Sequence, residues 1–403
     1  MSAPIVVAWG AGSVGRGFIG DLFSAAGWQI VFVDMDARLI DAIQRDGGYP
    51  HETVDTDCTN RRDIRGATAI FATDQEAIHD YIARASLVTT SVGSRALPAV
   101  AQSLAAALRY RWDQGGGAID VFLCENLHGA EAYMRALIED AIGEEHIERS
   151  RRDLGLIETV ISRMIPPIIG EEAEREPTLI RVEPYRILPY AALSLKASEP
   201  AVDGLIPVRD VDFSLYTDRK LFVHNLGHCV CAYLGDLLGT RYIWEAIAIP
   251  EVRHITQATM TESLAALSGS FGVTPLPLLE HSDDLLARFT NRALGDTNER
   301  VGRDPERKMA REDRFLGAYR LAVSSGAPRG YLSLALALGG QKLSQQQGWD
   351  VVRARDYVRR EIQDAGGDDQ DCRLFDLQWE ALASGWDWGQ QVAFIDRHVR
   401  NKD

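Results

Sequence analysis

Short runs rich in apolar residues recur through the first third of the chain, at residues 5–9, 29–33, 69–72, 87–93 and 120–124. Runs of this length with little polar alternation are typical of strands that are buried on both faces. Segments with helical character lie between them, at residues 16–26 and 97–110. Strands that alternate with helices predict an α/β fold, with a doubly wound, largely parallel sheet of the Rossmann-like type.

The pattern changes in the second half of the chain. Residues 154–165 are mostly apolar, and residues 178–188 are expected to form a last strand. Helical spacing then dominates, at residues 221–237, 241–248, 255–268, 282–294, 313–325, 330–338 and 349–365. The chain therefore predicts a Rossmann-like domain at residues 1–196 and a mainly α-helical domain at residues 197–403. Four tryptophans are expected to pack within the terminal helices: Trp349, Trp379, Trp386 and Trp388.

The first strand leads into a glycine-rich turn with the spacing G-x-G-x-x-G, formed by Gly10, Ala11, Gly12, Ser13, Val14 and Gly15. Between a strand and a helix, Gly10 allows a tight turn, Gly12 lets the backbone approach a pyrophosphate, and Gly15 permits close packing. Asp34 ends the second strand, where its carboxylate would accept from ribose hydroxyls and repel a 2′-phosphate. The motif predicts NAD binding. The run at residues 87–93 is expected to end near the cofactor and to place Val92 beside it. A glycine-rich turn in some other α/β unit is the alternative.

Two polar residues, Glu125 and Asn126, stand directly after the fifth apolar run. In open α/β sheets the carboxyl ends of the strands hold the ligand crevice. Asn126 is therefore a candidate hydrogen-bond donor in the active site. The alternative is a turn-forming asparagine at the end of a strand.

The segment from Asp218 to Gly235 is expected to be a buried helix, with Asp218 as its N-cap and Gly235 at its end. At about 100° per residue, four polar side chains fall within an arc of roughly 140°. They are Lys220, His224, Asn225 and His228. Buried polar groups need partners or a chemical role. One face of this helix is thus a candidate catalytic surface, and a core helix with a snorkelling lysine is the alternative.

A metal site is the other possibility for this helix. His224 and His228 are one helical turn apart, a spacing that zinc can use. The glutamate of the H-E-x-x-H motif is absent, because Asn225 follows His224. The sequence also has no C-x-x-C pair. We therefore expect no metal here.

Cations concentrate between residues 300 and 314 of an otherwise acidic chain. Gly302 and Pro305 predict a loop, and Arg303, Arg307 and Lys308 give it the positive charge that suits a phosphate. A solvated surface loop whose arginines pair with neighbouring carboxylates is the alternative.

Composition limits the other classes of function. Lys and Arg total 43 against 58 Asp and Glu, a net charge of −15 that disfavours nucleic acid and anionic membranes as partners. The N-terminus has no basic region, and no apolar run reaches about 18 residues, so no membrane segment is expected. Five cysteines without a disulfide framework indicate reduced thiols and a cytoplasmic protein.

Four motifs together resemble the polyol-specific long-chain dehydrogenases: the extended glycine motif of residues 10–20, Thr89-Thr-Ser-Val-Gly93, Cys124-Glu-Asn126, and Lys220-x4-Asn225-x2-His228. The loop Val301-Gly-Arg303-Asp-Pro-Glu-Arg307-Lys308 is similar to that of the mannitol-1-phosphate 5-dehydrogenase branch. The resemblance covers residues 5 to about 340 and weakens in the tail.

This resemblance implies a metal-independent NAD dehydrogenase with a Rossmann domain, a helical substrate domain and an active site between them. It implies that Lys220 is the general base, that Asn225 and Asn126 hold the oxygen being oxidised, and that His228 positions substrate. The implied substrate is a polyol phosphate, with mannitol 1-phosphate oxidised to fructose 6-phosphate. The alternatives are an unphosphorylated polyol or sugar acid of the mannitol or mannonate type, and a non-catalytic NAD-binding protein.

Two positions depart from the family pattern. Ser162-Arg163 stands where the family often has Asp-Arg, and Arg292 stands where it has a proline. If the missing carboxylate supports the cofactor or substrate, we expect Ser162 to shift substrate choice or lower activity. The sequence leaves the oligomeric state open.

Overall fold

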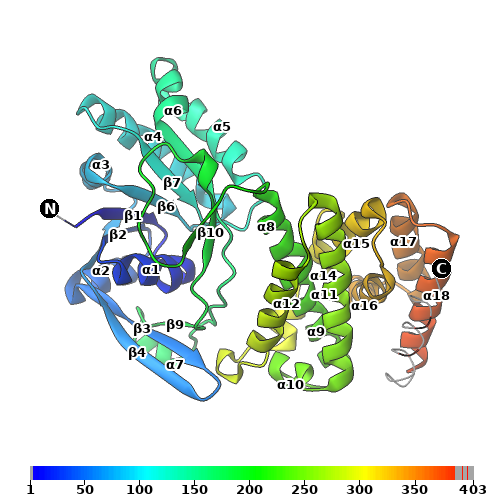
Figure 1. Cartoon of the computed structure of the whole chain (residues 1–403). Helices are drawn as coiled ribbons and strands as arrows, with labels where there is room; N and C mark the ends of the chain where they lie inside the picture. The colour runs from blue at the N-terminus through cyan, green and yellow to red at the C-terminus, as the bar shows by residue number, and fades with distance from the viewer. Residues whose placement is uncertain (1–2, 386–392, 394–396, 398–403) are drawn as a thin grey trace. The chain divides into compact units, whose positions relative to one another are not determined.

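A computed structural model describes residues 3–385, 393 and 397 of the chain (Figure 1). The chain divides into two compact units, Met1–Phe213 and Ser214–Asp403. Trp386 and Trp388, which were expected in terminal helices, lie outside the described residues.

The first unit is built on a parallel six-stranded sheet with the order β5-β2-β1-β6-β7-β8 (Figure 1). Its strands are β1 (Ile5–Trp9), β2 (Gln29–Asp34), β5 (Ala67–Phe71), β6 (Leu87–Thr90), β7 (Ile119–Leu123) and β8 (Leu154–Glu158). The helices around it are α1 (Gly20–Ala25), α2 (Ala37–Asp46), α3 (Gln75–Arg84), α4 (Leu97–Asp113), α5 (Ala130–Ile142) and α6 (Ile147–Asp153). The predicted fold class is confirmed.

Alternate residues of β1 show why its sequence is apolar throughout. Ile5, Val7 and Trp9 pack with α3, α4 and α5 on one face of the sheet. Val6 and Ala8 pack with α1 and α2 on the other face. A strand with both faces buried against helices has no position left for a solvated side chain.

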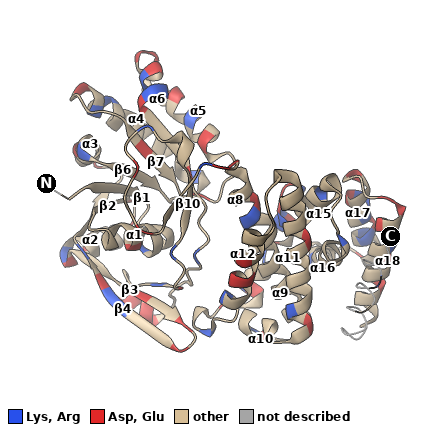
Figure 2. Ribbon diagram, viewed as in Figure 1, with Lys and Arg blue, Asp and Glu red and all other residues tan. Residues whose placement is uncertain are grey.

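A second, smaller sheet in this unit was not predicted. The strands β3 (Gly48–Asp55) and β4 (Cys58–Arg65) form an antiparallel hairpin, and β9 (Ile180–Val182) pairs with β3. Most side chains of β4 are exposed, and charged residues follow the hairpin (Figure 2). A strand so polar lacks the apolar alternation that reveals a half-buried strand in a sequence.

The single strand predicted at residues 178–188 is wrong. The structure has two short strands there, because β9 ends at Val182 and β10 (Leu188–Ala191) begins six residues later. Pro184 lies in this gap and has no N–H for a strand ladder. The strand β11 (Leu205–Val208) pairs with β10 and belongs to the first unit. The short helix α7 (Glu171–Arg175) precedes β9.

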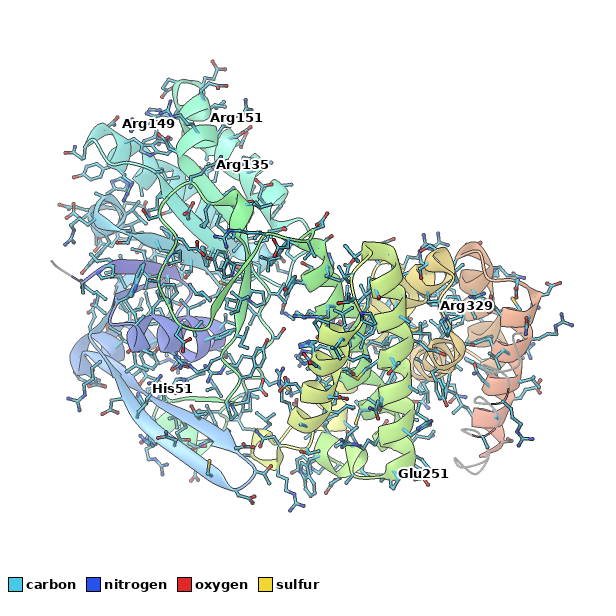
Figure 3. The ribbon with its side chains drawn as sticks, viewed as in Figure 1. His51, Arg135, Arg149, Arg151, Glu251 and Arg329 are labelled. Carbon is cyan, nitrogen blue, oxygen red and sulfur yellow. The ribbon has the colours of Figure 1, made fainter. Side chains whose placement is uncertain are left out.

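A buried carboxylate fastens the hairpin to the helix that follows the glycine-rich turn. Asp21, on α1, is 1% exposed, and its Oδ2 lies 2.6 Å from Arg163 Nη1 and 3.0 Å from Arg186 Nε. Its other oxygen pairs with Arg62 on β4. His51 on β3, labelled in Figure 3, is also buried, and its burial beside Arg163 lowers its pKa to about 4. This histidine is therefore neutral at physiological pH.

The second unit is helical, as predicted. Its α-helices are α8 (Ser214–Arg219), α9 (Leu226–Leu237), α10 (Ile243–Ile247), α11 (Pro250–Phe271), α12 (Leu276–Arg288), α13 (Asn298–Gly302), α14 (Pro305–Lys308), α15 (Arg314–Ser325), α16 (Gly330–Gln347), α17 (Val351–Asp364) and α18 (Asp369–Ser384). Trp379 is buried on α18, as expected of a packing residue. No helix among the described residues is long and apolar enough to cross a membrane.

The predicted start of the central helix is wrong, whereas the predicted segment 221–237 ends at Leu237, the last residue of α9. Helix α8 already begins at Ser214, because no residue between there and Asp218 breaks a helix. Gly235 lies inside α9, where a Cβ would come within 2.5 Å of Asn298 Nδ2 and 2.6 Å of Ala246 Cβ. This glycine therefore serves close helix packing, and it does not end the helix.

Candidate active site

The glycine-rich turn joins β1 to a short π-helix, η1 (Gly15–Ile19), at the point where the strand order of the sheet reverses. Gly10 has a φ of +101°, and a Cβ on Gly15 would lie 1.9 Å from the carbonyl oxygen of Gly10. A Cβ on Gly12, in contrast, would meet nothing within 4 Å. The close approach of Gly10 and Gly15 therefore forms the tight turn. The open space in front of Gly12 lets the backbone approach a pyrophosphate.

The Asp34 carboxylate is fixed at the end of β2. Its Oδ2 accepts from the Ala11 amide at 2.6 Å, and its Oδ1 accepts from the amides of Met35 at 2.7 Å and Asp36 at 3.0 Å. A carboxylate has about four acceptor positions, so it can still accept from a ribose hydroxyl. The turn and this acidic residue fit NAD.

A residue without a predicted role shapes the neighbouring strand end. The Glu125 carboxylate accepts from the Val92 amide at 3.0 Å and from the Gly93 amide at 2.8 Å. Glu125 thereby connects the end of β6 to the end of β7. The next residue in the chain is the exposed Asn126. Val92 and Asn126 thus stand at the same edge of the sheet, where α/β folds bind ligands.

The predicted catalytic run of the second unit contains a π-helical turn. Residues Lys220–Asn225 form the π-helix η5, between α8 and α9. In an α-helix, residues five apart are separated by about 140° around the axis, but a π-turn links residue i to residue i+5. The turn therefore brings Lys220 and Asn225 onto one face more closely than an α-helix would. Such turns are frequent at functional sites.

Lys220 has the environment that a general base requires. Its side chain is half-buried, and burial together with the positive charge of Arg314 lowers its pKa to about 8. Arg314 begins α15, a helix that contacts η5, and its Nε lies 2.8 Å from Asp313. The amine is thus partly deprotonated near neutral pH, when it can accept a proton.

The two histidines of this run have different surroundings. His224 is buried, and burial together with the charge of Arg288 lowers its pKa well below the ordinary value, so it is neutral. The ring of His228 stacks on Phe289 with centroids 4.8 Å apart and planes 15° apart. Its Nε2 lies 3.3 Å from Asp296 Oδ2, a partner that no local sequence pattern indicated.

The expected basic loop is partly helical, with Arg303 and Asp304 between α13 and α14. Lys308 is buried, and its Nζ donates to the carbonyls of Val301 and Arg303. Arg307 pairs with Asp304 at 2.9 Å and with Asp313 at 3.0 Å. Arg303 is exposed, and no carboxylate pairs with it within the described part of the chain.

Ser162, the departure from the family pattern, is buried just beyond the end of β8. Its neighbour Arg163 belongs to the buried cluster around Asp21. Across residues 3–385 and the two described positions beyond them, no three His, Cys, Asp or Glu side chains gather as a metal site would need.

Known family models match both units of the chain. The model of the mannitol dehydrogenase Rossmann domain matches residues 4–204, and that of the mannitol dehydrogenase C-terminal domain matches residues 212–371. A mannitol-1-phosphate 5-dehydrogenase of Brevibacillus brevis is 32% identical over 333 residues, 83% of this chain and 84% of the relative. Another, from Halalkalibacterium halodurans, is 32% identical over 320 residues, 79% of this chain and 83% of the relative.

Two solved structures share the fold. The mannitol 2-dehydrogenase of Pseudomonas fluorescens, in a ternary complex with NAD and D-mannitol, has a TM-score of 0.72 at 17% identity and covers all of this chain and 95% of its own. A substrate-free D-sorbitol dehydrogenase has the same TM-score at 18% identity and covers 85% of this chain and 80% of its own. The chain belongs to the mannitol dehydrogenase family and is an NAD-dependent polyol dehydrogenase.

Proposed function

We propose that this enzyme interconverts mannitol 1-phosphate and fructose 6-phosphate, with Lys220 as the general base. The observation that carries the mechanism is the half-buried lysine, whose pKa is lowered to about 8, one π-turn away from Asn225. The observation that carries the substrate is the 32% identity to two relatives named mannitol-1-phosphate 5-dehydrogenases.

Oxidation of a secondary alcohol needs a proton to leave oxygen while hydride leaves carbon, and bound NAD supplies the hydride acceptor. Lys220 takes the hydroxyl proton. The amide of Asn225 donates to that oxygen and stabilises the negative charge that develops on it, and the family resemblance assigns the same role to Asn126. His228 positions the substrate, and no metal is required for any of these roles. In the first unit, Gly10, Gly12, Ser13, Val14, Gly15, Asp34 and Val92 bind the cofactor.

The substrate phosphate binds at the basic loop, with Arg303 as its main contact because this guanidinium is exposed and has no carboxylate partner in the described structure. Arg307 and Lys308 are held by neighbouring groups, so their contribution is to shape the loop and supply positive charge. The same contacts favour a second candidate, an unphosphorylated polyol or sugar acid, since they leave only one of the three cationic side chains, Arg303, available to a phosphate. The five free cysteines suit a cytoplasmic setting.

The test is NADH oxidation by the purified, chelator-treated protein with fructose 6-phosphate and with fructose. We expect turnover with the phosphate, and loss of turnover in Lys220→Met while NADH still binds. Arg303→Gln should raise the KM for fructose 6-phosphate roughly 10- to 100-fold, as for loss of a charged hydrogen bond, and leave that for fructose unchanged.

Arg311→Gln is the matched control, because this arginine belongs to the same segment but pairs with Glu361 and Asp364 on α17. Turnover with fructose alone would assign the second candidate. Full activity in Lys220→Met would remove Lys220 as the base.

A further inference from the structure

The helix that follows the glycine-rich turn does not begin as a regular α-helix. In the π-helix η1, the Gly20 amide donates to the carbonyl of Gly15, five residues earlier. Such turns are rare and frequent at functional sites. A side chain that bonds to the backbone of a helix competes with its regular ladder and can hold an irregular turn in place. Two side chains from distant parts of the first unit bond to carbonyl oxygens of η1 in this way.

Arg163 bonds to one of these carbonyls. Its Nη1 donates to the carbonyl of Gly17 at 2.9 Å and to Asp21 Oδ2 at 2.6 Å. Its Nε donates to the carbonyl of Glu183 at 2.9 Å, and none of the Arg163 side chain is exposed. Because a guanidinium presents its donors in a rigid planar fork, these bonds fix η1 relative to α1 and to the segment that follows β9.

Tyr49, on β3, bonds to the neighbouring carbonyl. Its buried hydroxyl donates to the carbonyl of Arg16 at 2.8 Å. The approach is close, since a Cβ on Gly20 would lie 2.0 Å from this hydroxyl. Gly20 therefore makes room for Tyr49, which explains why the glycine motif of residues 10–20 extends beyond G-x-G-x-x-G.

The side chain of Arg16 connects η1 to the glycine-rich turn itself. Its Nε donates to the carbonyl of Ala11 at 2.6 Å, and its Nη1 donates to the carbonyl of Thr178. The Ala11 amide in turn donates to Asp34 Oδ2. A displacement of Arg16 would therefore shift Ala11, the residue before Gly12, where the pyrophosphate is expected.

We propose that Arg163 and Tyr49 are positioning residues for NAD, which hold η1 in its π-helical form and so preorganise the glycine-rich turn for the pyrophosphate. This inference rests on the part of the proposed function that places the pyrophosphate at Gly12. Without either side chain, η1 relaxes toward a regular α-helix, and NAD has to restore the π-turn when it binds. The free energy of that reordering is taken from the binding of NAD, so the affinity falls.

The first test removes a single hydroxyl, the change that disturbs the fold least. We would measure the Kd for NADH by fluorescence titration, and the melting temperature, of full-length Tyr49→Phe. The matched control is Tyr190→Phe, because the Tyr190 side chain is also buried and its hydroxyl donates to Glu199 at 2.6 Å, outside η1. Both variants should lower the melting temperature. Tyr49→Phe alone should raise the Kd for NADH, roughly threefold to tenfold, as for a lost neutral hydrogen bond. Equal Kd values in the two variants would overturn the proposal.

The second test separates the positioning of the cofactor from the stability of the buried ion cluster. Arg163→Gln should raise the Kd for NADH roughly 10- to 100-fold, as for a lost charged hydrogen bond. Arg186→Gln is the matched control, because Arg186 pairs with the same Asp21 carboxylate at 3.0 Å and also donates to the carbonyl of Asp21 on α1. It should lower the melting temperature but leave the Kd unchanged. An equal rise in both arginine variants would assign the effect to stability alone and refute the positioning role.

Gly12→Ala distinguishes a failure of this inference from a failure of the proposed cofactor site. A raised Kd in Gly12→Ala, with wild-type affinity in Tyr49→Phe and Arg163→Gln, would overturn the positioning role alone. Wild-type affinity in all three variants would overturn the placement of the pyrophosphate as well.

Discussion

The lowered pKa of Lys220 makes a quantitative prediction about the dependence of activity on pH. The difference between an ordinary lysine pKa of 10.5 and one of about 8 corresponds to about 3.4 kcal/mol. At pH 7 it raises the deprotonated fraction from roughly 0.03% to roughly 10%, about 300-fold. Burial of the charged amine also lowers the free energy of unfolding. This destabilisation is fully present below pH 8 and is lost as the pH rises from about 8 to 10.5, because the folded state releases the proton before the unfolded state does.

The assay is the pH profile of kcat/KM for polyol oxidation at saturating NAD, between pH 6 and pH 10. The rate should rise tenfold per pH unit at low pH and level off near pH 8, or somewhat lower because the nicotinamide of bound NAD is cationic. Arg314→Gln removes the adjacent positive charge, so the plateau should begin at higher pH, with activity reduced at pH 7 and recovered near pH 9.5.

Arg311→Gln removes an equal charge at an exposed site and should leave the profile unchanged. A wild-type profile without an inflection between about pH 7 and pH 9 would refute the reasoning, as would an Arg314→Gln profile identical to that of the wild type. In the direction of ketone reduction the protonated lysine is the acid, so the rate should instead fall above pH 8.

Other substitutions test the cofactor site and the buried ion cluster. Gly12→Ala should fold normally but raise the Kd for NAD at least 10-fold in a fluorescence titration, because its Cβ points into open space; an unchanged Kd would argue against a pyrophosphate there. Gly15→Ala should instead lower the melting temperature, since its Cβ would strike the carbonyl of Gly10. Asp21→Asn should cost about 3–5 kcal/mol in urea unfolding, as expected when one partner of a buried ion pair is removed. Asp46→Asn, at the exposed pair with Arg45, should change the free energy of unfolding far less than Asp21→Asn, and equal losses in the two variants would contradict the role given to burial.

The sequence by itself determined the parts of the fold whose signal is local. Strands β1, β2 and β7 are largely buried on both faces, so their sequences are mostly apolar and were predicted to within one residue at each end. The G-x-G-x-x-G turn was recognisable because glycine is the residue that accepts such close backbone approach. The helical character of the second unit followed from apolar spacing in the same way.

Tertiary structure decided the features that depend on contacts between distant residues. The hairpin of β3 and β4 was missed because its outer strand is mostly solvated. Gly235 was taken as the end of the helix around Lys220 because its close packing against Asn298 and Ala246 is not visible in the sequence. The pairing of Asp296 with His228 spans 68 residues, and the charge of Arg314 reaches Lys220 from another helix.

Sequence alone could therefore name the amine, the amides and the imidazole of the site. The pKa of that amine and the orientation of that imidazole arise from burial and from charges that only the folded chain brings together.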